Sequence, residues 1–141
     1  MAKAIGATVI RASAALTTSY VAGTVVNVTG CDEVVVCIAY TMGAAEAGNS
    51  VIFKVDWSMD NSTYYTDADP WPNSDAISTG AITVDKNIFT YTADSAAATY
   101  DYIAVPISVR GRYCKVSFKE DGVAANAGTC AAILVDITNA A

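Results

Sequence analysis

Ser50–Ser58 reads SVIFKVDWS, and the pattern of this stretch decides the fold class. One side of the segment carries Val51, Phe53, Val55 and Trp57, and the other side carries Ile52, Lys54, Asp56 and Ser58. Successive side chains of a β-strand point to opposite faces of its sheet. The alternation therefore predicts a half-buried strand with Trp57 in the core.

The same two-residue period recurs toward the carboxyl end of the chain. Within Arg112–Lys119 the apolar positions are Cys114, Val116 and Phe118, and within Cys130–Ile137 they are Ala131, Ile133, Val135 and Ile137. The intervening Glu120–Gly128 contains an Asp-Gly step, which is typical of a tight turn. We therefore predict that these two strands pair as a hairpin.

Five further segments have weaker strand signals: Thr24–Val28, Glu33–Tyr40, Ala81–Val84, Asn87–Thr92 and Tyr100–Ile107. Glu33–Tyr40 is apolar on both faces, which predicts a central strand covered on each side. Pro106 ends its strand or places it at a sheet edge, because proline cannot donate a ladder hydrogen bond. The Ala-rich segment 93–99 allows at most one or two helical turns.

Many short strands with almost no helix predict an all-β protein, an antiparallel two-sheet β-sandwich of jelly-roll or Greek-key type. The 141 residues suit one domain, which we place at residues 24–141. Residues 1–23 lack a decisive pattern and are predicted to be an extended N-terminal arm or the first edge strand. Such an arm can add a strand to the open edge of a neighbouring molecule.

The composition narrows the possible functions. Charged residues make up 16% of the chain, hydrophobic residues 53%, and the net charge is −6. The acidic balance argues against binding along a nucleic-acid backbone, and no apolar run is long enough to span a membrane. The sequence contains no histidine, which excludes Ser-His-Asp and Cys-His catalytic sites. So few charges suit permanent contacts with other subunits, unless alanine merely inflates the hydrophobic fraction.

Cysteine and aspartate are the remaining candidates for chemistry. The spacing of Cys31, Cys37, Cys114 and Cys130 matches no zinc or redox motif, so we expect free buried thiols and maturation in a reducing cytoplasm. Asp60, Asp67 and Asp69 could bind Ca²⁺, but the alternative is that they cap turns, and we favour it. We therefore predict no metal, no cofactor and no catalytic site.

Exposed aromatic and basic residues are the candidates for an interface or for ligand contact. They are Tyr64, Tyr65, Trp71, Arg110 and Arg112. Tyrosine and tryptophan give a large contact area for few rotatable bonds, and arginine pairs with acidic partners. The alternatives are that the tyrosines close the edge of the sandwich and that the arginines belong to an ordinary solvated strand.

Two segments of the chain carry a recognisable hairpin pattern. In Phe53–Tyr65 a strand ends in Trp-Ser and is followed by Asp-Asn and paired aromatic residues. This resembles a hairpin of phage virion accessory proteins and of discoidin-type binding modules, with Asn61 where glycine is usual. Asparagine also accepts left-handed turns. Arg112–Phe118, followed by an Ala-Ile-Leu-Val strand, is similar to the closing hairpin of both groups.

The resemblance implies a phage head-decoration (cement) or minor capsid protein. Such proteins are often trimers that clamp capsomers, and they catalyse nothing. It further implies binding to the major capsid protein or other virion subunits, homo-oligomers with a trimer favoured, and location in a virion assembled in the bacterial host cytoplasm. The alternative is a discoidin-like carbohydrate-binding module, but discoidin-type modules are generally secreted, and we detect no signal peptide.

Overall fold

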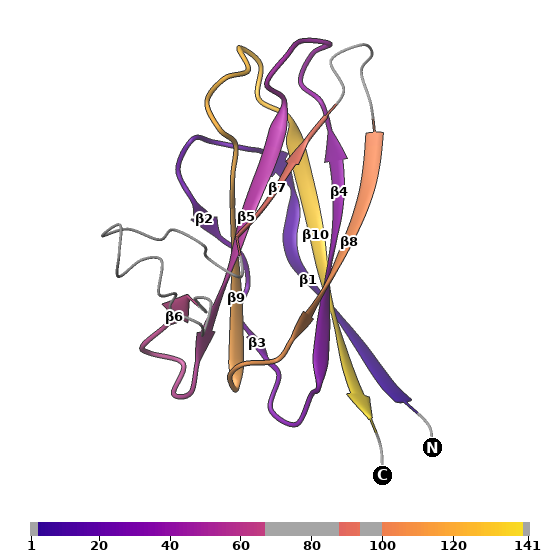
Figure 1. The fold of residues 1–141 in the computed structure, drawn as a ribbon, viewed down its shortest axis with the longest axis vertical. Coiled ribbons are helices and arrows are strands. Elements are labelled where there is room, and N and C mark those ends of the chain that lie inside the picture. Colours follow the sequence, from indigo (N-terminus) through magenta and orange to yellow (C-terminus); the bar gives the residue numbers. More distant parts are fainter. Residues whose placement is uncertain (1–2, 67–87, 94–99, 140–141) are drawn as a thin grey trace, which may run out of the picture.

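The computed structural model describes residues 3–66, 88–93 and 100–139, which form ten strands (Figure 1). The strands are β1 (Lys3–Ala15), β2 (Val21–Ala22), β3 (Val26–Asn27), β4 (Glu33–Thr41), β5 (Ser50–Ser58), β6 (Tyr65–Thr66), β7 (Ile88–Thr92), β8 (Tyr100–Ser108), β9 (Tyr113–Lys119) and β10 (Thr129–Asn139). Every pairing between them is antiparallel.

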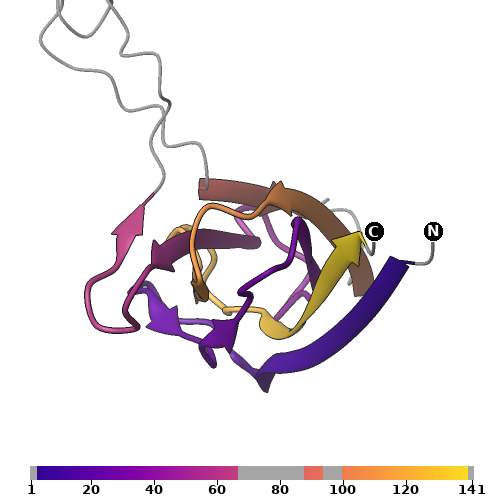
Figure 2. The same cartoon turned by 90° about the horizontal axis from the view of Figure 1, so that it is seen from below.

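The strands form two sheets that face each other across the core (Figure 2). Sheet A has the order β1-β10-β4-β8. Sheet B has the order β2-β9-β5-β6, with β3 also paired to β9 and β7 to β5. If β2 and β3 are counted as one interrupted strand, most strands that follow one another in the sequence lie in opposite sheets, as in a jelly roll. The predicted all-β, two-sheet antiparallel sandwich is confirmed.

The core lies between β5 of sheet B and β4 of sheet A. Val51, Phe53, Val55 and Trp57 of β5 are all buried, as predicted. The strand is not half-buried, however, because Asp56 and Ser58 on its other side are buried as well. Phe53 stacks on Phe89 with ring centroids 4.9 Å apart and lies 6.1 Å from the ring of Phe118. Aromatic packing of this kind supplies a large share of the buried apolar area of a small sandwich.

The predicted hairpin between the last two long strands is wrong. β9 pairs with β5 in sheet B, whereas β10 pairs with β1 and β4 in sheet A. The Asp121-Gly122 step does turn the chain, and Gly122 has a φ of 83°. The turn leads across the core instead of back along the same sheet. In a jelly roll, strands adjacent in sequence often belong to opposite sheets.

β1 occupies an edge of sheet A and pairs with β10 from Lys3 to Ala15. The pairing is regular up to Val9, and irregularities follow between Val9 and Arg11 and between Arg11 and Ala14. The Arg11 side chain stabilises this region: its Nε donates to the Cys130 carbonyl at 3.0 Å, and its Nη2 donates to two carbonyls of β1 itself. β-bulges of this kind bend a strand and end its regular edge.

Asn49 organises the loop between β4 and β5. Its side chain is fully buried, and its Nδ2 donates to the carbonyls of Ala44 at 3.0 Å and Glu46 at 3.1 Å. Its Oδ1 accepts from the Gly43 amide at 3.3 Å and from the Tyr40 hydroxyl at 3.4 Å. Burial raises the pKa of Tyr40 to about 12, with a smaller contribution from the charge of Glu120.

Some expected elements cannot be compared with the structure. Ala81–Val84 and residues 94–99 lie outside the described residues. Of the predicted strand Thr24–Val28, β3 covers Val26–Asn27. The described residues contain no helix of the length and hydropathy needed to cross a membrane.

Candidate interaction surfaces

The outward face of sheet A is apolar, and we call it the apolar face. Its side chains are Ile5, Ala7 and Val9 of β1, Ala131, Ile133, Val135 and Ile137 of β10, Val35, Cys37 and Ala39 of β4, and Tyr102, Ala104 and Pro106 of β8. Four of the large ones are well exposed, namely Tyr102 by 77%, Ile5 by 68%, Val9 by 63% and Ile133 by 41%, whereas Val35, Val135 and Ile137 are partly buried.

Strand register places these side chains in rows that cross the whole sheet. One row is Val9, Ile133, Cys37 and Ala104, and the next is Ala7, Val135, Val35 and Pro106. The rows at the two ends contain polar side chains, with Glu33 and Ser108 at one end and Thr129 and Thr41 at the other. From strand spacing the face measures roughly 500 Å² in outline, near the upper end for the largest apolar patch of a monomer.

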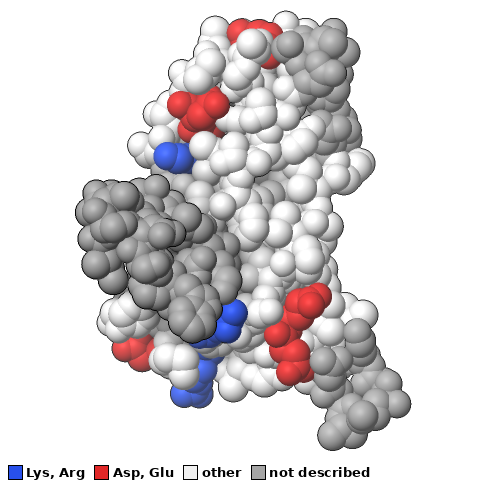
Figure 3. Space-filling view, in the orientation of Figure 1, with Lys and Arg blue, Asp and Glu red and all other residues white. Residues whose placement is uncertain are grey.

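The outward face of sheet B is different in kind. It carries Lys54, Asp56, Lys115 and Lys119 on β5 and β9. Lys54 Nζ lies 3.7 Å from Asp56 Oδ2, and the ammonium groups of Lys54 and Lys119 lie 4.8 Å and 4.6 Å from the ring centroid of Tyr20. Charged atoms are sparse on the β4 and β8 side in the middle of Figure 3. Sheet B therefore has a polar outward face, on which Asp56, Ser58 and Ser117 are buried, and sheet A does not have one.

A shallow groove of about 520 Å³ runs across the upper half of the apolar face. Small side chains form its floor, namely Cys37, Ala39, Ala104 and Ala131, while Val9, Tyr102 and Ile133 stand at its sides. Arg11 also lines the groove, but its guanidinium is hydrogen-bonded to backbone carbonyls and lies 5.7 Å from the ring centroid of buried Phe118. The groove has no cluster of polar groups that could orient a substrate.

β4 shows what is unusual about this face. Its inward side chains are buried, and its position between β10 and β8 confirms the predicted central strand. The sequence also predicted a cover on the outward side, where β4 carries Val35, Cys37 and Ala39. Within the described part of the chain, no strand packs over that side. Strands that are apolar on both faces are typical of sheets covered on both faces.

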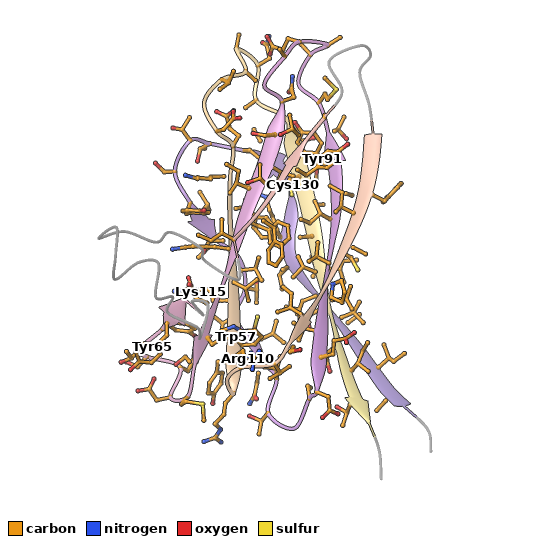
Figure 4. The ribbon with its side chains drawn as sticks, in the orientation of Figure 1. Trp57, Tyr65, Tyr91, Arg110, Lys115 and Cys130 are labelled. Atoms are coloured by element: carbon orange, nitrogen blue, oxygen red, sulfur yellow. The ribbon has the colours of Figure 1, made fainter. Side chains whose placement is uncertain are left out.

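The structure places four of the five predicted contact residues at one end of the molecule. Tyr64 ends the turn after β5 and Tyr65 begins β6, while Arg110 and Arg112 lie in the turn between β8 and β9. The turns are joined where the Arg112 amide donates to the Ser58 carbonyl at 3.0 Å. Tyr65, Lys115 and Arg110 accordingly lie toward the same end in Figure 4. Trp71 lies outside the described residues.

Tyr64 and Tyr65 differ in what they offer a ligand. Lys115 Nζ lies 4.0 Å from the ring centroid of Tyr64, so one face of that ring is covered by a cation. The Tyr64 hydroxyl donates to Asn61 Oδ1. Tyr65 pairs with Trp57 across β5 and β6, and its side chain is exposed. The pair does not form a two-ring platform on which a sugar could stack.

Asp60 caps a turn, which is the role that we favoured from the sequence over Ca²⁺ binding. Its Oδ1 accepts from the amides of Ser62 and Thr63, both at 2.9 Å, and from the Ser58 hydroxyl at 3.0 Å. These hydrogen bonds, led by the one from Thr63, lower the pKa of Asp60. Asp67 and Asp69 lie outside the described residues, and the described ones contain no group of three or more Cys, Asp or Glu suited to a metal.

All four cysteines are free thiols. Burial raises the pKa of Cys114 to about 12 and that of Cys130 to about 11, so both are protonated and unreactive at neutral pH. Cys31 accepts a hydrogen bond from the Thr138 hydroxyl with an oxygen–sulfur distance of 3.6 Å. Cys37 is partly exposed, and it lies in the floor of the groove on the apolar face.

Sequence reasoning missed the apolar face as a surface. The signal was present in two places: the apolar positions on both sides of Glu33–Tyr40, and the set Ala131, Ile133, Val135 and Ile137. The second set was taken only as evidence of a strand. Which side of β10 faces the core depends on the strands that it pairs with. The predicted hairpin gave β10 the wrong partner, so its outward side was not recognised.

Comparison with known proteins gives little to set beside this geometry. No protein-family model matches the chain, and no curated protein matches it in sequence. Among solved structures, the chain is similar to one reported as "Bacillus endospore appendages form a novel family of disulfide-linked pili". The two are 14% identical, the match covers 99% of this chain and 93% of that one, and the TM-score is 0.42.

Proposed function

We propose that this chain is a non-enzymatic structural subunit of a bacteriophage particle, which decorates or cements the shell. In this proposal the apolar face is buried against the major capsid protein or another virion subunit, and the chain acts as a homo-oligomer in the assembled particle. The mechanism is burial of surface between subunits, and it requires no cofactor.

The observation that supports the proposal most is the apolar face itself. The three central rows are apolar across all the strands that they cross, whereas the outward face of sheet B carries Lys54, Lys115 and Lys119. A groove that lacks convergent polar groups suits a protein surface better than a substrate. The chain has no histidine, and the described residues contain no metal-binding cluster.

The proposal is tested with virions purified from a lysate of cells that carry the gene. An antibody against the chain should detect it in the particle band of a density gradient. Particles that lack the chain should bind the purified protein in a sedimentation assay. Tyr102→Asp combined with Ile133→Asp should lower binding at least tenfold, because both put charge on the apolar face.

The matched control is Thr90→Asp, which adds a charge at an exposed position of β7 in sheet B. It should bind particles as the unaltered chain does. The proposal is wrong if the chain is absent from particles, or if the double variant and the control bind equally well.

A further inference from the structure

β1 forms one edge of sheet A, and one of its two long sides faces away from the sheet. In the described part of the chain its paired neighbour is β10, on one side only. The Ile10 carbonyl accepts from the Thr24 amide at 2.9 Å, so the backbone of β1 already has a partner on this side at Ile10. Ala4–Val9 remains as a regular edge. In an antiparallel strand, alternate residues direct their N–H and C=O groups away from the paired neighbour.

This edge lacks the features that usually prevent strands from pairing with other molecules. Ala4–Val9 reads AIGATV, with no charge and no proline, and the irregularities of β1 begin only after Val9. The opposite edge of sheet A is β8, which carries Pro106 near its carboxyl end. Proline, charged residues and bulges are the common means of blocking an edge. Sheet A is therefore blocked at β8 and open at β1.

We propose that β1 of one molecule pairs antiparallel with β1 of a second copy, about a two-fold axis at Ala7. Ala7 then faces Ala7 of the second copy, and Ile5 faces its Val9. Two-fold antiparallel pairing keeps the apolar faces of both copies on the same side, so the two sheets become one continuous sheet.

The register follows from the side chains that are exposed. Ile5 and Val9 are exposed by 68% and 63%, and only the axis at Ala7 sets them against each other. An axis at Gly6 would place Val9 opposite Lys3, and an axis at Thr8 would place Ile5 opposite Arg11, inside the irregular part of β1. Cross-strand pairs of β-branched side chains are the favoured contacts of a sheet.

Pairing of β1 with β1 of a second copy fits this edge better than pairing of β1 with β8 of another molecule. Pairing of β1 with β8 would repeat without closing, and Pro106 removes a donor from the β8 edge. The contact is narrow, with roughly 400–500 Å² buried in total, well below the about 1,200 Å² of stable interfaces. We therefore expect a weak dimer in solution, which is strengthened when both copies are held on one particle.

The pairing does not rest on the proposed function, and it is measured on the purified protein alone. In a background with Cys31→Ser and Cys37→Ser, Ala7→Cys should form a covalent dimer under mild oxidation, because directly opposed residues are within disulfide distance. The control Ala4→Cys should stay monomeric, since the two thiols would be roughly 20 Å apart along the strands.

Charge variants test the register independently. Ile5→Lys with Val9→Lys places like charges opposite each other and should raise the dissociation constant at least fivefold in sedimentation velocity. Ile5→Lys with Val9→Glu places opposite charges in the same positions and should restore dimer formation. Ile5 and Val9 are both exposed, so circular dichroism and thermal unfolding should show that the fold is unchanged in both variants.

The outcomes separate this proposal from the proposed function. A mass that rises with concentration toward twice 14.6 kDa, together with selective cross-linking at Ala7, supports the pairing. A trimer, a monomer at every concentration, or equal cross-linking at Ala4 and Ala7 overturns it. Loss of particle binding in the Tyr102→Asp, Ile133→Asp variant concerns the apolar face and leaves the β1 pairing unaffected.

Discussion

Val9 and Ile133 lie directly opposite each other across β1 and β10, and both side chains point away from the core. The next residue along β10, Leu134, points the other way and is fully buried. Neighbouring aliphatic residues of similar size thus occupy opposite environments. In most sandwiches the outward position would be polar. The pair shows that the outward side of sheet A carries aliphatic side chains where polar ones are usual.

Substitutions at Ile133 and at Leu134 should change the free energy of unfolding of the isolated chain by very different amounts. Leu134→Ala should lower the free energy of unfolding by about 2–5 kcal/mol, because it opens a cavity in the core. Ile133→Thr keeps a β-branched side chain at an exposed position and should change it by less than about 0.5 kcal/mol. Urea unfolding of dilute protein measures both. Equal losses would mean that Ile133 is already buried in the isolated molecule.

Asn49 should be among the polar residues most important for stability. Asn49→Ala removes two donated and two accepted hydrogen bonds at a buried site, and we expect a loss of about 2–4 kcal/mol. Tyr40→Phe removes one of the four and should cost about 1 kcal/mol. The control is Asn27→Ala, where a single exposed bond to the Thr29 amide is lost. A loss at Asn49 no larger than at Asn27 would contradict this account.

Several strands were predictable from short apolar runs bounded by turn residues, even where the two-residue period was weak. Glu33–Tyr40 was predicted and β4 is Glu33–Thr41; Tyr100–Ile107 was predicted and β8 is Tyr100–Ser108. The pairing was not predictable in the same way, because an alternating pattern fixes the faces of a strand and not its neighbours. β9 and β10 show this, since the turn signal at Asp121-Gly122 holds although the strands do not pair.

The candidate surface was predictable only in general terms. Few charged residues implied that other proteins cover part of the chain, but not which part. The apolar face is assembled from four strands that are far apart in the sequence, and it becomes visible only when their register is known. The predicted residues Arg110 and Arg112 came from local composition, and their location beside the Tyr64–Tyr65 turn depends on the β5–β9 pairing.

Replacement of Asn61 by glycine should be tolerated, whereas replacement by other residues should destabilise the chain. Its φ of 58° lies in the left-handed region, as the sequence predicted for the turn after β5. Asn61→Gly and Asn61→Ala both remove the side chain that accepts from the Tyr64 hydroxyl, so their difference isolates the backbone conformation. Asn61→Ala should be less stable than Asn61→Gly by about 1–2 kcal/mol in thermal or urea unfolding. Equal stability would place the turn in another conformation in solution.

The thiols should report both burial and the state of the apolar face. Because burial raises the pKa of Cys114 to about 12 and of Cys130 to about 11, both thiols stay protonated in the folded chain. Their ordinary value is 9.0, so this contribution to stability is fully present below pH 9 and is lost as the pH rises through 11–12. Cys130→Ala should therefore make unfolding less sensitive to pH between 9 and 11.

At pH 8, a maleimide should label Cys31 and Cys37 in the folded chain, and Cys114 and Cys130 only after unfolding, as read by mass spectrometry. Cys37→Ser should remove one label without changing the others. Cys37 lies in the floor of the groove on the apolar face. Binding of the chain to a particle should therefore slow the labelling of Cys37 at least tenfold relative to the free chain. Labelling of Cys37 at the same rate on the particle as in solution would show that the apolar face stays open there, and that the chain attaches by another surface.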